Sequence, residues 1–296
     1  MTDAPGPTAG QEHGGPPALA DQPPSGHRAA LEVQEISLRF GALWALTDVS
    51  FDVGEHELFA IIGPNGAGKT SMFNLLSRVY DPTRGRIRCF GTDMSRLRAH
   101  HLARAGIART FQNLGLFPYS SVLDNVLTGR VHLMRSGTVR AGLMLPFARN
   151  EERQNRDAAF AAISEVGLAR YAYHPAGALP YGLQKRVELA RAIAMEPKIL
   201  LLDEPVAGMS RTERSEIVDL IRALHTARQM AIVLVEHDMG VVMGLAHRVL
   251  VLDFGRPIAL GTPAQVQADP EVIRAYLGEP APAKDPGVDA GTAAAQ

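Results

Sequence analysis

The chain has 296 residues, 46% of them hydrophobic, and a formal net charge of −1 at pH 7. This composition predicts a globular protein with a well-buried core. It gives no sign of a strongly basic face, so nucleic acid is the weaker partner hypothesis. Cys89 is the only cysteine, which excludes an intrachain disulfide. No apolar run approaches the roughly 18 residues of a membrane-spanning helix, and the first residues lack the order of a signal peptide. Any work at a membrane is therefore expected to be peripheral.

Residues 1–29 and 279–296 are rich in Pro, Gly and Ala and contain almost no large apolar side chain. We predict a disordered leader and a disordered tail around one folded region, 30–278. Apolar residues at near-alternate spacing predict antiparallel strands over 31–40 and 49–53. Phe40 ends the first strand, where its ring is placed to stack on an adenine. The alternative is a core phenylalanine, because aromatic residues are common in strands.

The stretch Gly63-Pro-Asn-Gly-Ala-Gly-Lys-Thr-Ser71 follows an apolar run and precedes apolar residues at helical spacing. Gly63, Gly68, Lys69 and Thr70 fill the G-x-x-x-x-G-K-[ST] pattern of a phosphate-binding loop. The glycines let backbone N–H groups point inward, and the following helix adds its unpaired first-turn donors. Lys69 is expected to reach the β- and γ-phosphates, and Thr70 to place its hydroxyl on Mg²⁺. A glycine-rich turn used only for packing is the alternative.

Gln112 follows a short apolar run and precedes a loop, so its amide is expected near the metal or an attacking water. Taken alone, such a glutamine is more often a solvated loop residue. Residues 130–149 carry several arginines among Leu and Met without a clear period, which favours an exposed insertion over a membrane-bound surface. The spacing of apolar residues predicts a helix over 150–166.

A further helix is predicted over 185–195, after Leu179-Pro-Tyr-Gly-Leu-Gln184. Lys185 and Arg186 are expected in its first turn, where they oppose the helix dipole. A basic helix start beside a glycine suits an anion, such as the γ-phosphate of a nucleotide held by another subunit.

Two carboxylates come directly after the apolar run 199–202, which is typical of a strand buried on both faces of a parallel sheet. Asp203 is expected to contact Mg²⁺ through water, and Glu204 to polarise a water that attacks the γ-phosphate. His237 follows the next apolar run and is expected at the same sheet edge, where a neutral imidazole can hydrogen-bond the γ-phosphate. The alternatives are a surface acidic pair and a histidine without a role.

Two shorter patterns complete the chain. Ser210-Arg-Thr-Glu213 predicts a capping box at the start of a helix. The apolar runs 249–252 and 258–260 predict a hairpin.

The order of these motifs resembles the ATP-binding cassette family over residues 31–278. Four stretches are similar to the ATP-binding subunits of branched-chain amino acid importers: Leu179-Pro-Tyr-Gly182, Val206-Ala-Gly-Met209, Glu236-His-Asp-Met239 and Ala275-Tyr-Leu-Gly278. The resemblance implies an α/β fold of the P-loop NTPase class, the nucleotide-binding domain of this family. Its core sheet is expected to be mostly parallel, with an N-terminal antiparallel β subdomain and an inserted helical subdomain at about 113–195.

The resemblance also implies ATP and Mg²⁺ as ligands, and roles for single residues. Phe40 would stack on adenine, Gln112 would sense the metal and couple to a membrane subunit, Asp203 would serve the metal, Glu204 would be the general base and His237 the switch histidine. The phosphates and Mg²⁺ would be bound by Asn65, Gly66, Ala67, Gly68, Lys69, Thr70 and Ser71. An opposing subunit's nucleotide site would be completed by Tyr181, Gly182 and Leu183, so two sites form only when two cassettes close face to face.

The chain departs from the general family signature at a few positions. Pro180 and Tyr181 stand where that signature has Ser and Gly, and Ser210 stands where it has Asp. Pro180 has no hydroxyl or N–H to offer a γ-phosphate, and Ser210 cannot accept as a carboxylate across a dimer. Hydrolysis is still expected, because replacement of the signature Ser and Gly, here by Pro180 and Tyr181, also resembles the branched-chain branch.

The function that the resemblance implies is ATP-driven import of branched-chain or related amino acids. A pair of cassettes, identical or related, would drive a separate permease at the cytoplasmic face of the plasma (inner) membrane, with a periplasmic or extracellular solute-binding protein as an indirect partner. One alternative is the ATPase subunit of a lipid or lipopolysaccharide exporter, whose signature keeps Ser-Gly-Gly. Another is a soluble ATPase acting on nucleic acid or ribosomes, which usually has two cassettes or a coiled-coil insertion.

Overall fold

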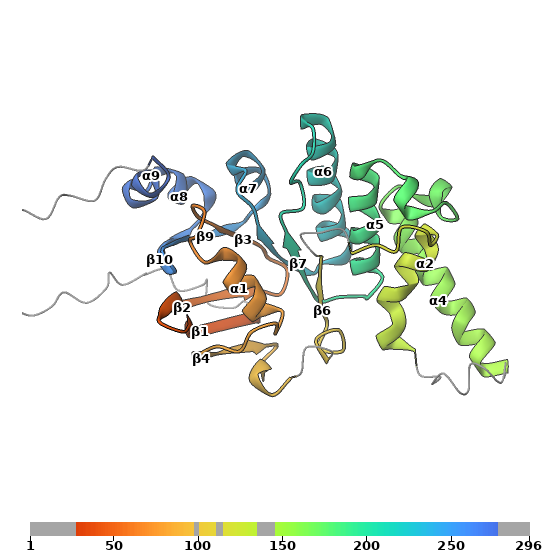
Figure 1. The fold of residues 1–296 in the computed structure, drawn as a ribbon, viewed down its shortest axis with the longest axis horizontal. Coiled ribbons are helices and arrows are strands. Elements are labelled where there is room, and N and C mark those ends of the chain that lie inside the picture. The colour runs from red at the N-terminus through yellow and green to blue at the C-terminus, as the bar shows by residue number, and fades with distance from the viewer. Residues whose placement is uncertain (1–27, 98–100, 111–114, 135–145, 278–296) are drawn as a thin grey trace, which may run out of the picture.

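The structure is a computed structural model that describes residues 28–97, 101–110, 115–134 and 146–277. Two sheets and the helices around them form an elongated molecule (Figure 1). The smaller sheet is antiparallel where β1 pairs with β2 and β4, and its strand order is β2-β1-β4-β5. Its strands are β1 (Ala29–Phe40), β2 (Leu43–Gly54), β4 (Arg84–Cys89) and β5 (Thr92–Asp93). The antiparallel strands predicted from the N-terminal apolar pattern are confirmed.

The larger sheet has six strands in the order β10-β9-β3-β8-β7-β6. They are β3 (Leu58–Ile62), β6 (Ile107–Arg109), β7 (Ile199–Asp203), β8 (Ala231–Val235), β9 (Arg248–Asp253) and β10 (Arg256–Gly261). All neighbours pair in parallel except β9 and β10, which form the predicted hairpin. The expected mostly parallel core sheet is therefore confirmed.

The helices divide into three groups in Figure 1. One helix lies between the two sheets, α1 (Lys69–Leu76). A second group forms one end of the molecule and comprises α2 (Val122–Leu127), η3 (Thr128–Leu133), α4 (Pro146–Glu165), η4 (Ala169–Tyr171), η5 (Ala176–Ala178) and α5 (Tyr181–Ile193). The third comprises α6 (Arg211–Arg228), α7 (Met239–Leu245), α8 (Pro263–Ala268) and α9 (Pro270–Leu277). A single turn, η1 (Met94–Arg96), follows β5. None of the helices in the described part of the chain is long and apolar enough to cross a membrane.

Alternate residues of the central strands pack into two separate cores. In β3, Phe59 and Ile61 face the core shared with α1 and the antiparallel sheet, whereas Leu58 and Ile62 face the core shared with α5 to α9. A strand buried on both faces has to be apolar at every position, which is why β3, β7 and β8 appear in the sequence as unbroken hydrophobic runs. Burying each such side chain contributes about 1.5–3 kcal/mol. Polar side chains can then occur only where these strands end.

Two helices begin earlier than their predicted starts. Helix α4 begins at Pro146, because proline fits the first turn, where its missing N–H has no partner to lose. Helix α5 begins at Tyr181, after Pro180 in its N-cap position, so Lys185 and Arg186 lie beyond the first turn. Lys185 pairs with Glu188 and Arg186 with Glu216. The prediction that these two cations form a basic helix start for an anion is therefore wrong.

The predicted exposed insertion is described only at its two ends. Residues 135–145 lie outside the described residues. Arg130, at the start of the insertion, is buried, and its guanidinium donates to Glu196 Oε1 at 2.8 Å, Asn155 Oδ1 at 2.8 Å and Ala194 O at 2.8 Å. Arg130 is thus part of the packing between α4 and α5 rather than of an exposed surface.

Three histidines gather at the amino edge of the parallel sheet. The ring centroids of His225 and His247 are 5.4 Å apart, and His225 Nε2 lies 3.2 Å from the backbone oxygen of His56. Burial lowers the pKa of His225, the hydrogen bond to His56 opposes this shift, and the nearby His247 and His56 add to it. The folded protein therefore accepts a proton on His225 less readily than the unfolded chain does.

We expect the protein to lose stability as the pH falls below about 6.5, because the unfolded chain protonates His225 at a higher pH than the folded protein. The loss levels off below the lowered folded pKa. His225→Phe keeps a ring against His247 and removes this contribution, so its melting temperature should fall less between about pH 7.5 and about pH 5.5. His174→Phe, at the far end of the molecule, should behave as the wild type. Equal pH dependence in the wild type and His225→Phe would contradict the expectation.

Candidate functional site

The glycine loop connects β3 to α1 and depends on two glycines. Gly63 has φ +149°, and a Cβ there would lie 2.1 Å from the backbone oxygen of Leu252. Gly68, the N-cap of α1, has φ +100°, and a Cβ there would lie 2.8 Å from Ala45 O. Both positions therefore require glycine, for conformation and for space. The loop is held against β2 on one side and the β9–β10 hairpin on the other.

Lys69 folds back over this loop. Its Nζ donates to the carbonyl oxygens of Gly63 at 2.7 Å and Pro64 at 2.9 Å. Burial lowers the pKa of Lys69, and the carboxylate of Glu204 opposes the shift. An ammonium removed from water in this way interacts more strongly with an anion than an exposed lysine does.

The other predicted loop residues differ in exposure. Asn65 and Gly66 are exposed, and Thr70 is exposed at the start of α1, with Ser71 half-buried beside it. Ala67 is buried, and its carbonyl accepts from Gly255 N–H at 3.0 Å. An open loop followed by a helix N-terminus fits phosphate groups. The hydroxyl of Thr70 and the carboxylate of Asp203 are hard oxygen donors of the kind that Mg²⁺ prefers, so these residues fit both expected ligands.

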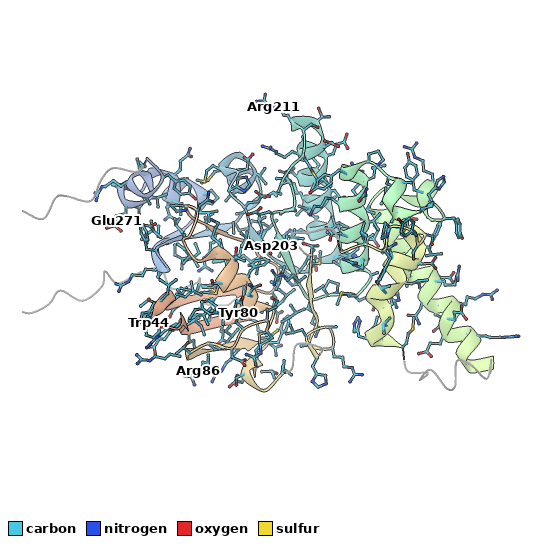
Figure 2. The ribbon with its side chains drawn as sticks, in the orientation of Figure 1. Trp44, Tyr80, Arg86, Asp203, Arg211 and Glu271 are labelled. Carbon is cyan, nitrogen blue, oxygen red and sulfur yellow. The ribbon has the colours of Figure 1, made fainter. Side chains whose placement is uncertain are left out.

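Three predicted residues follow the adjacent strands β7 and β8. Asp203 is the last residue of β7 and is buried; Figure 2 shows it near the centre of the molecule. Glu204 follows directly, with 25% of its side chain exposed. His237 lies after β8, 60% exposed, with Nδ1 4.0 Å from Glu204 Oε1. Because Val235 pairs with Asp203 and also with Ile61 of β3, these strand ends and the glycine loop meet at one sheet edge.

Glu204 adopts φ +47°, a left-handed conformation that residues other than glycine rarely take. Its N–H donates to Val235 O at 3.0 Å, and its carbonyl accepts from Ala207 N–H at 3.2 Å. These bonds hold the chain in the strained turn. Strain of about 1–3 kcal/mol at such a residue is a recurrent feature of functional sites.

Glu236 is a functional candidate that sequence reasoning quoted without giving it a role. It is fully buried, and its carboxylate accepts from Val206 N–H at 3.2 Å, His237 N–H at 3.1 Å and Asp238 N–H at 3.5 Å. Burial raises the pKa of Glu236, and the three N–H donors oppose this. One side chain thus fixes the loops that follow both β7 and β8. Only the three-dimensional contacts reveal this, because its partners are backbone groups.

Arg109 is a second residue that the sequence did not single out. It ends β6, and its NH2 lies 2.8 Å from Asp203 Oδ2. Gln112, which was predicted to sense the metal, lies three positions later and outside the described residues. Arg109 stands in the run Ile107–Gln112, but its partner Asp203 lies in β7, which neighbours β6 in the sheet and is far from it in the sequence.

Phe40 ends β1 and is 44% exposed. Its ring meets Tyr80 edge to face, with centroids 5.1 Å apart. Trp44, labelled in Figure 2, is another exposed aromatic on the same hairpin, and its ring contacts the guanidinium groups of Arg39 and Arg84. An exposed ring at this strand end fits a base-stacking role better than a core role for Phe40.

Tyr181, Gly182 and Leu183 form the first turn of α5, away from the glycine loop. The Tyr181 hydroxyl donates to Ala207 O at 3.4 Å, and a Cβ on Gly182 would lie 2.9 Å from Glu213 Oε1. The predicted capping box of Ser210 and Glu213 at the start of α6 is confirmed. Among the described residues, no hydrogen bond or ion pair joins 181–183 to 63–71. The two predicted parts of a nucleotide site are thus not joined by a polar contact within this part of the chain.

Comparison with known proteins identifies the family. Residues 46–207 match the family model described as ABC transporter, and residues 256–282 match one described as branched-chain amino acid ATP-binding cassette transporter. The chain is 40% identical to the high-affinity branched-chain amino acid transport ATP-binding protein BraF of Pseudomonas aeruginosa, over 85% of this chain and 99% of that protein. It is 39% identical to the protein of the same description, LivG, of Escherichia coli K12, over 84% and 98% of the two chains.

Solved structures show the same fold. A nucleotide-free ATP-binding cassette from an ABC transporter aligns with a TM-score of 0.74 at 28% identity, covering 85% of this chain and all of that one. The ADP conformation of an ATP-binding cassette of an ABC transporter aligns with the same TM-score and identity, and 99% of that chain is covered. Since the ABC transporter model spans more than half of the sequence, and relatives at about 40% identity span most of it, the chain belongs to the ATP-binding cassette transporter family.

Proposed function

We propose that this chain is the ATP-hydrolysing subunit of an importer for branched-chain or related amino acids. One observation carries the proposal: the glycine loop, Asp203, Glu204 and His237 meet at one edge of a parallel sheet in a chain that matches branched-chain transport subunits along nearly their whole length. These relatives favour import over lipid export and over action on nucleic acid or ribosomes.

The proposed mechanism assigns one task to each group. Lys69 and the loop N–H groups bind the β- and γ-phosphates, and Phe40 stacks on the adenine. Thr70 and Asp203 would hold Mg²⁺, with Gln112 as a further contact. When bound, the metal neutralises charge on the phosphates. Glu204 takes a proton from the attacking water as the new P–O bond forms at the γ-phosphorus, and the bond from that phosphorus to the bridging oxygen breaks, so that ADP leaves. His237, exposed and beside Glu204, orients that water and the γ-phosphate.

A second cassette completes the site in this proposal. Tyr181, Gly182 and Leu183 form the first turn of α5, in which Tyr181 is exposed, Leu183 half-buried and Gly182 buried. Two chains, identical or related, packed in opposite directions would bring each helix start to the other chain's nucleotide. Pro180 offers that nucleotide no N–H or hydroxyl, so the contact falls to the side chain of Tyr181 and the backbone of the first turn.

A groove supports the proposed docking of a permease. It has a volume of about 880 Å³ and lies between the end of α1, residues 101–107, η3 and the end of α5. Val79 and Val131 line it with more than half of their surfaces exposed, and Arg104 adds a positive charge. The groove includes Arg109, close in sequence to Gln112, so a permease segment bound there would contact the nucleotide edge indirectly. We place the protein at the cytoplasmic face of the plasma (inner) membrane, with a solute-binding protein as an indirect partner.

Glu204→Gln should lower ATP hydrolysis at least about 100-fold while ATP still binds, because a general base contributes about 10²–10⁴ to the rate. Wild-type activity should rise more than linearly with protein concentration, and the variant should form an ATP-bound dimer in size-exclusion chromatography. Glu271→Gln, on α9 far from Asp203 in Figure 2, is the control and should hydrolyse ATP normally. Undiminished hydrolysis by Glu204→Gln would overturn its role as base.

Lys69→Met should weaken ATP binding at least about 100-fold, because two charge-assisted hydrogen bonds are worth about 1.5–3 kcal/mol each. Its melting temperature without nucleotide should change little, since the variant also removes a partly desolvated charge. Equilibrium binding of a fluorescent ATP analogue measures the effect, with Lys198→Met as the matched control. Equal affinity in Lys69→Met and Lys198→Met would count against the phosphate site.

Val131→Asp places a charge in the apolar groove and should abolish co-purification with the permease while leaving ATP binding unchanged. Leu43→Asp makes the same kind of change at an exposed apolar residue of the β1–β2 hairpin and should leave co-purification intact. Retention of the permease by Val131→Asp would place the docking surface elsewhere.

A further inference from the structure

Arg109 connects three elements of the nucleotide site. Its NH2 donates to Asp203 Oδ2 at 2.8 Å. Its NH1 donates to Asn74 Oδ1 at 2.9 Å and to Ser77 Oγ at 2.5 Å, both near the end of α1. The guanidinium also lies over the ring of Phe73, 5.4 Å from its centroid. One side chain at the end of β6 thus joins the strand that ends in Asp203 to the helix that begins with Lys69.

The ion pair with Asp203 is almost completely removed from water. Only 13% of the Arg109 side chain and 5% of the Asp203 side chain are exposed. A carboxylate in such a place is strongly unfavourable unless a cation or several donors compensate it. Arg109 provides this compensation, with its NH2 2.8 Å from Asp203 Oδ2. The pairing occupies an oxygen of the same carboxylate that the proposed function assigns to Mg²⁺.

We propose that Arg109 is a positioning residue that holds and orients the Asp203 carboxylate, and thereby sets the Mg²⁺ concentration that nucleotide binding requires. This inference rests on the proposed role of Asp203 toward Mg²⁺. The guanidinium and the metal ion are two cations acting on one carboxylate. The guanidinium weakens binding of Mg²⁺ for two reasons. It repels the ion, and it already compensates the charge of the buried Asp203 carboxylate.

Loss of the Arg109 charge should raise the apparent affinity for Mg²⁺. Removal of the Arg109 charge leaves Asp203 uncompensated, so the metal-free protein becomes less stable. Binding of Mg²⁺ with the nucleotide then compensates the buried Asp203 carboxylate, which gains more free energy in the variant than in the wild type. The apparent affinity for Mg²⁺ therefore rises. A residue that only packs α1 against β7 would have the opposite effect, because its loss would loosen the site and weaken metal binding.

The experiment measures binding of a fluorescent ADP analogue as Mg²⁺ is titrated, which requires no turnover. Arg109→Met removes the charge and keeps most of the apolar stem. Arg109→Gln removes the charge and can still donate to Asp203, so it serves if the Met variant does not fold. Arg109→Lys keeps the charge. Arg130→Met is the matched control, because Arg130 is also buried, with a 2.8 Å contact to Glu196.

We expect the half-saturating Mg²⁺ concentration to fall about 5- to 10-fold in Arg109→Met and Arg109→Gln, consistent with a coupling between two sites of about that size. It should stay near the wild-type value in Arg109→Lys and Arg130→Met. The melting temperature without ligand should fall in both neutral Arg109 variants, and the rise on adding Mg²⁺ with ADP should exceed that of the wild type.

An unchanged or higher half-saturating Mg²⁺ concentration in the neutral variants would overturn the inference and leave Arg109 as a packing residue. Nucleotide binding by the wild type that does not depend on Mg²⁺ would overturn the metal role of Asp203, and this inference with it. The wild-type titration therefore separates failure of the proposed function from failure of the role of Arg109.

Discussion

Parallel hydrogen bonding of β3 with β8, and of β8 with β7, determines where the polar groups of the site lie. Both faces of these strands are covered, by α1 and the antiparallel sheet on one side and by α5 to α9 on the other. A charged side chain in their middle would be buried without water, so charge is confined to the last residue of a strand, as at Asp203, and to the residues that follow. Because the strands run in the same direction, all these residues arrive at one edge. The glycine loop and the carboxylates meet there as a consequence of the sheet.

Two adjacent carboxylates at that edge acquire different surroundings. Asp203 is still part of β7, buried and paired with Arg109. Glu204 is turned by its left-handed backbone conformation and is partly exposed, next to His237 and within electrostatic range of Lys69. A buried, paired carboxylate suits a fixed cation, whereas a partly exposed one can reach water. Both residues carry a carboxylate, so their different roles follow from their different burial and partners rather than from residue type.

The sequence predicted the parts of the site that are contiguous motifs, and it missed contacts made over long distances. The glycine loop, the aspartate–glutamate pair and the capping box at Ser210 are local patterns with a known local geometry. Arg109 was not predicted because Asp203, its partner, belongs to another strand, and Glu236 because it binds backbone N–H groups, which have no sequence signal. The sequence predicts α5 from Lys185, whereas the helix begins at Tyr181 because Pro180 occupies its N-cap position.

Helix α5 connects the region that the proposal offers to a second cassette with the segment that follows Gln112. Its first turn carries Tyr181 and Gly182, and further along Glu188 accepts from Gly115 N–H at 3.3 Å while Arg191 donates to Gly115 O. Burial raises the pKa of Glu188, but Lys185, 3.3 Å away, and the Gly115 N–H favour its charged form. A helix moves as a rigid body more easily than it bends, because each bend breaks backbone hydrogen bonds. One rigid helix therefore carries the first turn that is offered to a second cassette and also holds Gly115, the residue three positions after Gln112.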